Sequence, residues 1–315
     1  MAHANDAPGS PADAIERIPP VRVAVIDVGS NSVRLLVAFV GQDGEVRELE
    51  RDRVYLRLGD DAYRIGRVGE RKLTALAESA ERYALRARAA GVERIETIVT
   101  APGRQSSNAD EVVDILRGAT RAPVSVLSAE DEGRLAWEGA VAALTHAPDT
   151  VAVVDLGGGS CEIAIGSPAT GPTWVCSRDA GALRVTRQLL PARSPTARDV
   201  ARARAGIGEL LDGVDPKHPD AALAVGGTAR ALARLLGPRF GPRKLDALAD
   251  RIVELGSERL TRWLDVTSPR AETLLAGTLV LADISRRLDA KLEVGRGGLR
   301  EGAVLALARV ESAAA

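Results

Sequence analysis

Two stretches of the chain share one pattern of apolar and polar positions. Residues 24–38, AVIDVGSNSVRLLVA, align without a gap on residues 152–166, AVVDLGGGSCEIAIG. Each stretch is an apolar run with Asp near its end, a turn of small residues, and a second apolar run, which is typical of two strands joined by a tight turn. A dinucleotide-binding fingerprint would lead from its glycines into a helix, whereas residues 33–40 are apolar except for Arg34 and include three valines, which favour a strand. We therefore predict two β-hairpins that are copies of one another.

The segments after the two hairpins also follow a common order. After the first, the periodicity predicts a strand at 46–54, a helix at 71–90, a strand at 94–99, a helix at 109–118, a strand at 123–127 and a helix after Ser128. After the second, it predicts a strand at 173–178, helices at 181–190 and 196–212, a strand at 221–225 and a helix at 228–236. Helices predominate from 244 onward, and the last is expected at 299–310. Each half runs βββαβα, so we predict an α/β fold of two tandem ribonuclease-H-like (actin-like) domains with a cleft between them.

This order suggests where the domains begin and end. Residues 1–20 end in Pro19-Pro20 and lack the basic and apolar regions of a signal peptide, so we expect a disordered tail. Residues 21–127 together with about 299–311 are expected to form domain I, and residues 128–298 domain II.

The composition excludes several classes of protein. The 315 residues carry 42 Lys and Arg against 43 Asp and Glu, a formal net charge of −1, and include only three Trp, three Tyr and two Phe. Such a balance argues against a nucleic-acid or membrane-surface binder, and so few aromatic residues argue against base stacking. Two cysteines and three histidines make a disulfide framework, a zinc site or a His-based triad improbable. We expect a cytoplasmic protein with no nucleic-acid or membrane partner; a homodimer stays open.

The turns of the two hairpins are candidate phosphate sites. Glycine lets the backbone approach an anion closely, and successive amides in a tight turn form an anion-binding concavity. The candidate residues are Gly29, Ser30, Asn31, Ser32, Gly157, Gly158, Gly159 and Ser160. Either turn alone could be purely structural, but two matched turns favour phosphate binding.

Three carboxylates stand beside these turns. Asp27 and Asp155 lie near the end of the first strand of each hairpin, and Glu162 lies on the outgoing strand of the second, where it can face the same side as Asp155. A carboxylate beside phosphate is repelled unless a cation lies between them, and Mg²⁺ prefers hard oxygen ligands. We therefore predict Mg²⁺ held by Asp27, Asp155 and Glu162, although an aspartate that caps its own turn would fit the same pattern.

A further acidic group opens the helix after Ser128, in the segment SAEDEGR. Ser128 fits an N-cap and Asp131 a capping-box carboxylate, while Glu130 and Asp131 complement the helix dipole. Glu132 can instead project toward the cleft, where a raised pKa would suit a general base that activates water. Spacing alone leaves this role and a plain dipole role open.

Two more segments are weaker candidates. Arg104, in TAPGR at the end of a strand, is expected on a loop at the edge of the cleft, where it could hold phosphate or be an ordinary surface arginine. Gly226, Gly227 and Thr228 join a strand to a helix and could hold a nucleotide or a further phosphate at the helix N-terminus. A polyanion also requires basic side chains in the cleft, and the candidates are Arg34, Arg104, Arg134, Arg178 and Arg184.

From about residue 22 to 310 the chain resembles the exopolyphosphatase/guanosine pentaphosphate phosphohydrolase (Ppx/GppA) family of the actin-like ATPase superfamily. The matching segments are VIDVGSNSVRLLV and VVDLGGGSCEIAIG for the phosphate loops, LSAEDEGRLAWEGA for the catalytic glutamate, AVGGTARALA, and GLREGAVL at the C-terminal end. The resemblance implies that Glu132 activates water and that Asp155 and Glu162 serve Mg²⁺ binding and catalysis. It also places Arg104 in a substrate-binding segment.

The sequence departs from the family pattern at three places and in its length. Cys161 replaces a common Thr, Pro102-Gly103 replaces Ser-Ala before Arg104, and Ala129 stands where Gly is frequent. The chain also resembles the short form of the family, which would favour shorter polyphosphate. We predict Mg²⁺-dependent hydrolysis of the terminal phosphoanhydride of inorganic polyphosphate. The alternatives are hydrolysis of guanosine pentaphosphate, an actin-like small-molecule kinase, and a non-catalytic sensor of polyphosphate or nucleotide.

Overall fold

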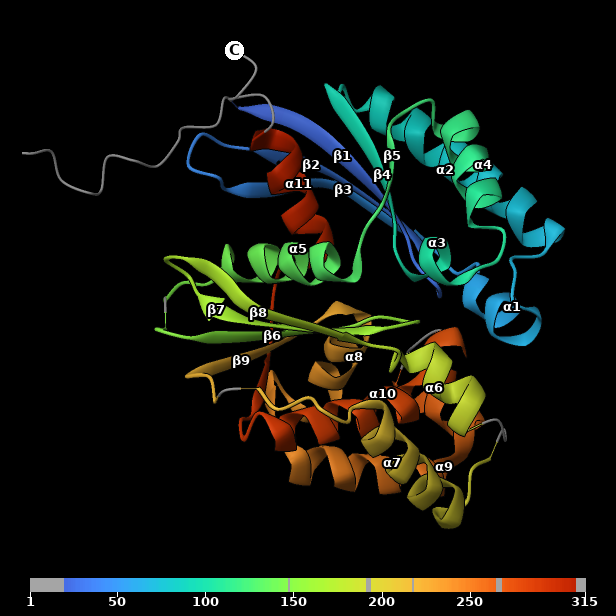
Figure 1. Ribbon diagram of the computed structural model, residues 1–315, viewed down its shortest axis with the longest axis vertical. Helices are drawn as coiled ribbons and strands as arrows, with labels where there is room; N and C mark the ends of the chain where they lie inside the picture. The colour runs from blue at the N-terminus through green and yellow to red at the C-terminus, as the bar shows by residue number, and fades with distance from the viewer. Residues whose placement is uncertain (1–19, 147, 191–193, 217, 265–267, 310–315) are drawn as a thin grey trace, which may run out of the picture.

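The computed structural model describes residues 20–146, 148–190, 194–216, 218–264 and 268–309. The predicted tail, except for Pro20, and residues 310–311 of the predicted domain I lie outside this part of the chain. Figure 1 shows two sheets, one above the other, each with helices on its outer side. Within the described residues, no helix has the length and apolar character needed to cross a bilayer.

The upper sheet has the strand order β3-β2-β1-β4-β5. Its strands are β1 (Val21–Val28), β2 (Val33–Val40), β3 (Val46–Val54), β4 (Arg94–Val99) and β5 (Val124–Val126). Strands β1 to β3 form an antiparallel meander, and β4 lies parallel to β1. Alternate residues of β1 face opposite sides: Ala24 and Ile26 pack in the core under α2 (Glu70–Ala89) and α4 (Ala109–Thr120), whereas Val23 and Val25 face α11 (Leu299–Arg309). Burial on both faces explains why these strands read as continuous apolar runs.

The lower sheet has the order β8-β7-β6-β9-β11-β10. Its first five strands correspond in order to β3-β2-β1-β4-β5 of the upper sheet, and β10 is an extra strand at the edge. Its strands are β6 (Val151–Leu156), β7 (Cys161–Ser167), β8 (Gly171–Arg178), β9 (Ala221–Val225), β10 (Arg239–Phe240) and β11 (Leu292–Val294). The helices on its outer side are α6 (Ala182–Leu189), α7 (Ala197–Leu210), α8 (Gly226–Leu236), α9 (Pro242–Leu264) and α10 (Ser268–Arg287). The common strand order of the two sheets confirms the predicted tandem of ribonuclease-H-like folds.

The structure corrects the sequence prediction at five elements. The short helix α1 (Leu58–Ile65) and the strands β10 and β11 were not predicted. The segment around Arg104 is the helix α3 (Ala101–Gln105) rather than a loop, because Pro102 stands in the first turn, where a missing N–H costs no helical hydrogen bond. Helix α8 begins at Gly226, two residues earlier than predicted.

Helices α5 (Ala129–Val141) and α11 pack against each other between the two sheets (Figure 1). Gly139 makes this packing close, because a Cβ there would overlap the carbonyl oxygen of Gly298 and the amide nitrogen of Gly302. On its other face α5 buries Trp137 against β6. The N-terminal end of α11 is therefore fixed beside the cleft.

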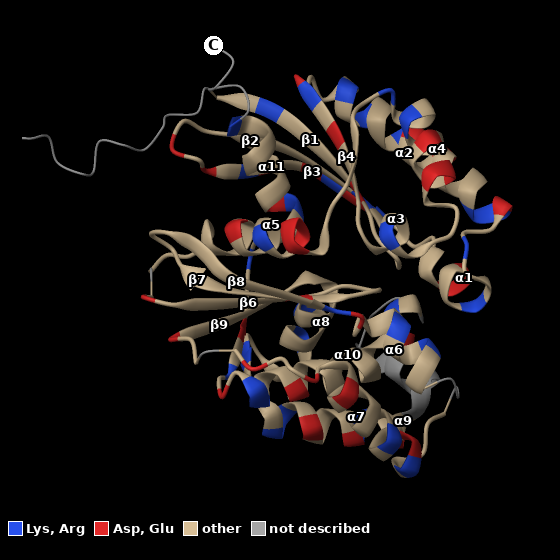
Figure 2. Ribbon diagram, viewed as in Figure 1, with Lys and Arg blue, Asp and Glu red and all other residues tan. Residues whose placement is uncertain are grey.

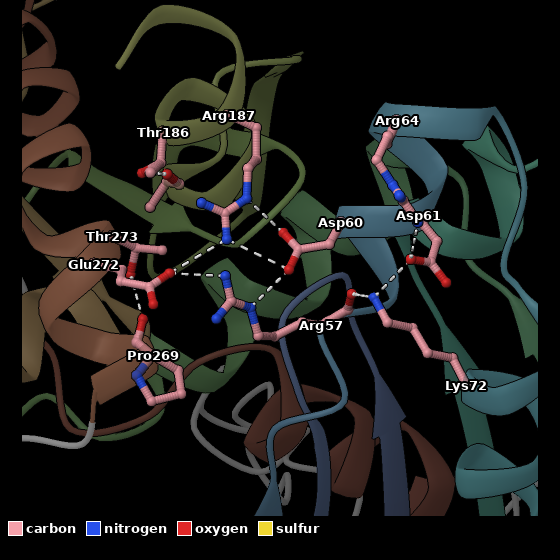
Figure 3. Close-up of polar contacts among 11 residues, drawn as sticks. Arg57, Asp60, Asp61, Arg64, Lys72, Thr186, Arg187, Pro269, Glu272 and Thr273 are labelled. Atoms are coloured by element: carbon pink, nitrogen blue, oxygen red, sulfur yellow. Dashed lines mark hydrogen bonds and ion pairs between the residues drawn. The ribbon is translucent and has the colours of Figure 1, made fainter. Parts of the chain in front are cut away.

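At the opposite side of the cleft, four charged side chains join the two halves. Figure 3 shows Arg57 and Asp60, at the start of α1, facing Arg187 of α6 and Glu272 of α10. The Arg57–Glu272 and Arg187–Asp60 pairs have N–O distances of 2.8 and 2.7 Å. We call this group the ion-pair cluster.

Candidate active site

The tips of the two predicted hairpins face each other across the cleft. Strands β1 and β2 pair antiparallel, as do β6 and β7, and each turn is closed by the same bond, Gly29 N to Ser32 O and Gly157 N to Ser160 O, both 3.1 Å. The tips approach closely, since a Cβ at Gly159 would lie 2.5 Å from Ser30 Oγ. The duplicated pattern in the sequence therefore corresponds to one shared site.

One pocket of about 60 Å³ lies between the hairpins. It is lined by all eight predicted turn residues together with Asp27, Asp155, Glu132 and Gly226. At 10–15 Å³ for each water, this volume holds roughly four to six water-sized groups, so phosphate oxygens fit between the turns. Within the described part of the chain, the amides of Ser30, Asn31, Gly158 and Gly159 donate to no backbone carbonyl, so they can donate to an anion.

Glu132 is held in this pocket by the first turn of α5. Ser128 caps the helix as predicted, with its Oγ accepting from the Asp131 amide at 3.0 Å. Glu132 is 6% exposed, and its Oε2 accepts from Arg104 Nη2 at 2.8 Å. Burial raises the pKa of Glu132 to about 7, with Arg104 opposing the shift and Asp155 and Asp27 adding to it. The carboxyl group can therefore exchange a proton near neutral pH.

Asp155 and Glu162 are direct cross-strand partners in the second hairpin, so their side chains lie on one face of the sheet. Burial raises the pKa of Asp155 to about 6, with Asp27 adding to the shift and Arg34 opposing it. Burial, together with Glu132 and Asp155, holds the pKa of Glu162 well above its usual range. Glu162 does not line the pocket; its Oε1 accepts from Ser177 Oγ at 2.8 Å, and its buried Oε2 has no hydrogen-bond partner among the described residues.

In the first hairpin the corresponding partner is a base. Asp27 lies opposite Arg34, and Arg34 Nη1 is 3.8 Å from Asp27 Oδ2. Arg34 itself lines the pocket.

The other arginines expected in the cleft lie elsewhere or serve other partners. Arg104 bridges Glu132 and the Leu127 carbonyl and does not line the pocket, so it orients the carboxylate. Arg184 donates to the Gly159 carbonyl behind the second turn. Arg134 pairs with exposed Glu130, and Arg178 bonds to the carbonyls of Ser177 and Asp212.

The Gly226–Thr228 segment is only partly open to the pocket. Gly226 lines it, but Arg270 packs against Gly227, and Arg270 Nη1 donates to Thr228 Oγ1 at 3.1 Å. Arg270 is 8% exposed, and burial lowers its pKa to about 10. This side chain occupies the place where the sequence suggested a nucleotide or a further phosphate.

Two basic residues of the pocket were missed from the sequence, Arg230 of α8 and Arg300 of α11. Arg300 lies in the GLREGAVL segment, so this motif could have pointed to it. Nothing in the local sequence, however, indicated that α11 starts at the cleft. Cys161, by contrast, packs in the apolar core of the lower sheet and is 1% exposed, and burial raises its thiol pKa.

The carboxylates of the pocket could hold Mg²⁺ only together with other ligands. Among the described residues, no three acidic, Cys or His side chains are placed to surround a metal ion by themselves. Mg²⁺ does not need that, because it is usually bound by one or two carboxylates together with substrate phosphates and water. Asp27 and Asp155 both face the pocket and repel each other, so they fit such an ion, whereas Glu162 fits a supporting position behind them.

Comparisons with known proteins identify the family to which the chain belongs. The sequence profile of the Ppx/GppA phosphatase family matches residues 37–311. Exopolyphosphatase 1 of Mycobacterium tuberculosis is 30% identical over 305 residues, which cover 90% of this chain and 88% of that protein; exopolyphosphatase 2 of the same species is 28% identical over 320 residues, covering 91% and 98%. The crystal structure of the Ppx/GppA family member of Aquifex aeolicus superimposes with a TM-score of 0.78 at 27% identity, covering 93% of this chain and 99% of that one. The chain therefore belongs to the Ppx/GppA phosphatase family and is a phosphoanhydride hydrolase.

Proposed function

We propose that the protein is a Mg²⁺-dependent exopolyphosphatase, which hydrolyses the terminal phosphoanhydride of inorganic polyphosphate and releases orthophosphate. The observation that carries the proposal is the pocket in which two amide-lined turns and the buried carboxyl of Glu132 meet. The names of the mycobacterial relatives supply the substrate class.

The roles of the residues follow from their positions. The turn amides and Arg34 hold the oxygens of the terminal phosphoryl group, since phosphoryl transfer depends mainly on positioning and charge neutralisation. Glu132, oriented by Arg104, accepts a proton from the attacking water. The water oxygen forms a bond to the terminal phosphorus, the bond from phosphorus to the bridging oxygen breaks, and the electron pair stays with the shortened chain.

Asp27 and Asp155 would hold the metal ion, with Glu162 behind them. When bound, Mg²⁺ neutralises charge on the transferred group. Because the pKa of Glu132 is about 7, the proposal expects the rate to rise with pH through about 7 as the carboxylate forms.

The pocket favours inorganic polyphosphate over guanosine pentaphosphate. Among the described residues, no aromatic side chain lines it, and Arg270 covers the Gly227–Thr228 segment. The ratio of kcat/KM for the two substrates tests this preference directly.

The experiment for the proposed function is Glu132→Gln, assayed as orthophosphate release from polyphosphate with and without Mg²⁺. Loss of the general base should lower kcat by on the order of 10²- to 10⁴-fold and leave KM nearly unchanged. Glu130→Gln, an exposed position in the same helical turn, is the matched control and should retain full activity. Unchanged turnover in the Glu132 variant would remove the general base from the proposal, and absence of release by the unaltered protein would refute the function.

A further inference from the structure

Arg230 and Arg300 are two cations of the pocket that form no ion pair with any residue the structure describes. Both line the pocket, Arg300 is 4% exposed, and Arg230 is partly buried. Among the described residues, neither guanidinium has a hydrogen-bond or ion-pair partner. Burial lowers the pKa of each to about 10, with Arg34 next among the causes. Holding two such cations together is unfavourable unless an anion joins them.

Three acidic groups act on these two cations: two are already paired with other arginines, and the third, Asp155, is one of the carboxylates expected to hold the metal ion. Glu301 acts on both cations, but its Oε1 is 3.0 Å from Arg51 Nη2. Asp27 acts on Arg300, but it lies beside Arg34. The positive charge of Arg230 and Arg300 is therefore left to face the pocket.

The start of α11 adds backbone donors at the same place. Gly297, Gly298 and Leu299 line the pocket, and the first intrahelical bond there runs from the Gly302 amide to the Gly298 carbonyl. The amides of the first turn of this 11-residue helix thus have no intrahelical acceptor, and they lie at the positive end of the helix dipole. Close packing at Gly139 fixes this end in position.

The electrostatics place the pair beside the reactive groups. The charges of Arg230 and Arg300 both act to lower the pKa of Asp155, which burial raises. The charge of Asp27 in turn acts to raise the pKa of Arg300, which burial lowers. The turns of the two hairpins already supply donors for one phosphoryl group, so the arginine pair is available for a second.

We propose that Arg230, Arg300 and the N-terminus of α11 form a second phosphate subsite, which holds the phosphate next to the terminal one. This inference rests on the proposed function and deepens it. When the bond from the terminal phosphorus to the bridging oxygen breaks, the electron pair stays on that oxygen, and the two guanidiniums stabilise the charge on this leaving phosphate. A phosphomonoester offers no second phosphate, so the subsite would make the enzyme select P–O–P over P–O–C bonds.

The test compares Arg230→Gln and Arg300→Gln with Arg234→Gln, an exposed arginine one turn later on α8. The first readout is equilibrium binding of inorganic pyrophosphate and of orthophosphate to the full chain, without metal. Each pocket variant should bind pyrophosphate on the order of 10- to 100-fold more weakly, as expected for loss of a charged hydrogen bond, and orthophosphate unchanged. Arg234→Gln should match the unaltered protein for both ligands.

The second readout is turnover of tripolyphosphate and of p-nitrophenyl phosphate. The pocket variants should lose kcat/KM for tripolyphosphate by a similar factor, so the ratio of kcat/KM for tripolyphosphate to that for the monoester should fall. If Arg300→Gln does not fold, Arg230→Gln carries the test alone, since that side chain is partly exposed.

The outcomes separate this inference from the function on which it rests. Equal weakening for orthophosphate and pyrophosphate, or no weakening for either, would overturn the second subsite. Weaker pyrophosphate binding by the variants of a protein that releases no phosphate from polyphosphate would leave the subsite standing and refute the proposed exopolyphosphatase activity. Normal hydrolysis of polyphosphate by the unaltered protein, with pyrophosphate binding unchanged in the variants, would support the proposed function and overturn the second subsite.

Discussion

The two hairpins share a backbone and differ in the charge opposite the aspartate. In the first, Asp27 pairs in register with Arg34; in the second, Asp155 pairs in register with Glu162. The first hairpin therefore neutralises its acid internally, at an Arg34–Asp27 distance of 3.8 Å. The second holds two acids side by side, and the pKa values of both are raised.

This difference gives the two copies of the hairpin different functions. In the first hairpin the charge of Asp27 is already balanced by Arg34, so its turn amides and this cation are suited to bind an anion. The second is stable only when a proton or a cation compensates its acids. It is therefore the hairpin that should respond to pH and to Mg²⁺.

The largest expected effect comes from making the same change on both hairpins, Asp155→Asn and Asp27→Asn. We expect Asp155→Asn to lower kcat/KM by on the order of 100-fold or more, since metal-assisted charge neutralisation is worth several kcal/mol. Asp27→Asn should lose less, on the order of 10-fold, because Arg34 remains to hold the anion. Orthophosphate release measured across a Mg²⁺ titration checks both, with exposed Asp114→Asn as the control. Equal losses would mean that the hairpins do not divide the work.

The second effect is on stability and its pH dependence, through Glu162→Gln. The folded-state pKa of Glu162 is raised, so the folded protein binds a proton more tightly than the unfolded chain, and this contribution is lost as pH rises from about 4.5 through the folded pKa. Glutamine keeps the neutral shape at every pH. We therefore expect the Tm of the variant, measured against that of the unaltered protein without Mg²⁺, to be a few degrees more favourable at pH 8 than at pH 5.

Glu130→Gln is the control for this measurement, because Glu130 is exposed and pairs with Arg134. A Tm difference that does not change with pH would contradict the charge conflict in the second hairpin.

The hairpins could be predicted from the sequence because burial on both faces leaves a continuous apolar run. Val25 and Ile26 face opposite cores, so no polar position interrupts residues 23–26 of the first strand. Strand β11, with only three residues and Glu293 exposed, carries no such pattern and was missed. Helix α1 was missed because it has only eight residues, LGDDAYRI, three of them charged, and because part of its packing, against α6, is made across the cleft.

The site was predictable where a motif repeats and not where distant segments meet. Glu132, Asp27 and Asp155 stand in recognisable local patterns. Arg230 and Arg300 come from helices far apart in the sequence, and only the packing of α5 on α11 brings the second of them to the pocket. Charge does not reveal them either: Figure 2 shows acidic and basic residues interspersed along α2, α4 and α7, so the functional arginines are hidden among many surface ones.

The smallest expected effect concerns the contact that keeps the two hairpins opposite each other. In the ion-pair cluster of Figure 3, Glu272 accepts from Arg57 of the upper half and Arg187 of the lower half, so Glu272→Gln weakens the link across the mouth of the cleft. Half-exposed ion pairs contribute about 0.2–1 kcal/mol each, so we expect a loss of roughly 2- to 5-fold in kcat/KM. Salt screens such pairs, so the difference from the unaltered protein should shrink as NaCl is raised, whereas the losses in the hairpin variants should persist. Glu254→Gln, which removes an exposed pair with Arg251 on α9, is the matched control and should leave kcat/KM unchanged at every salt concentration. A deficit in Glu272→Gln that does not depend on salt would show that the cluster does not hold the hairpins together through its charges.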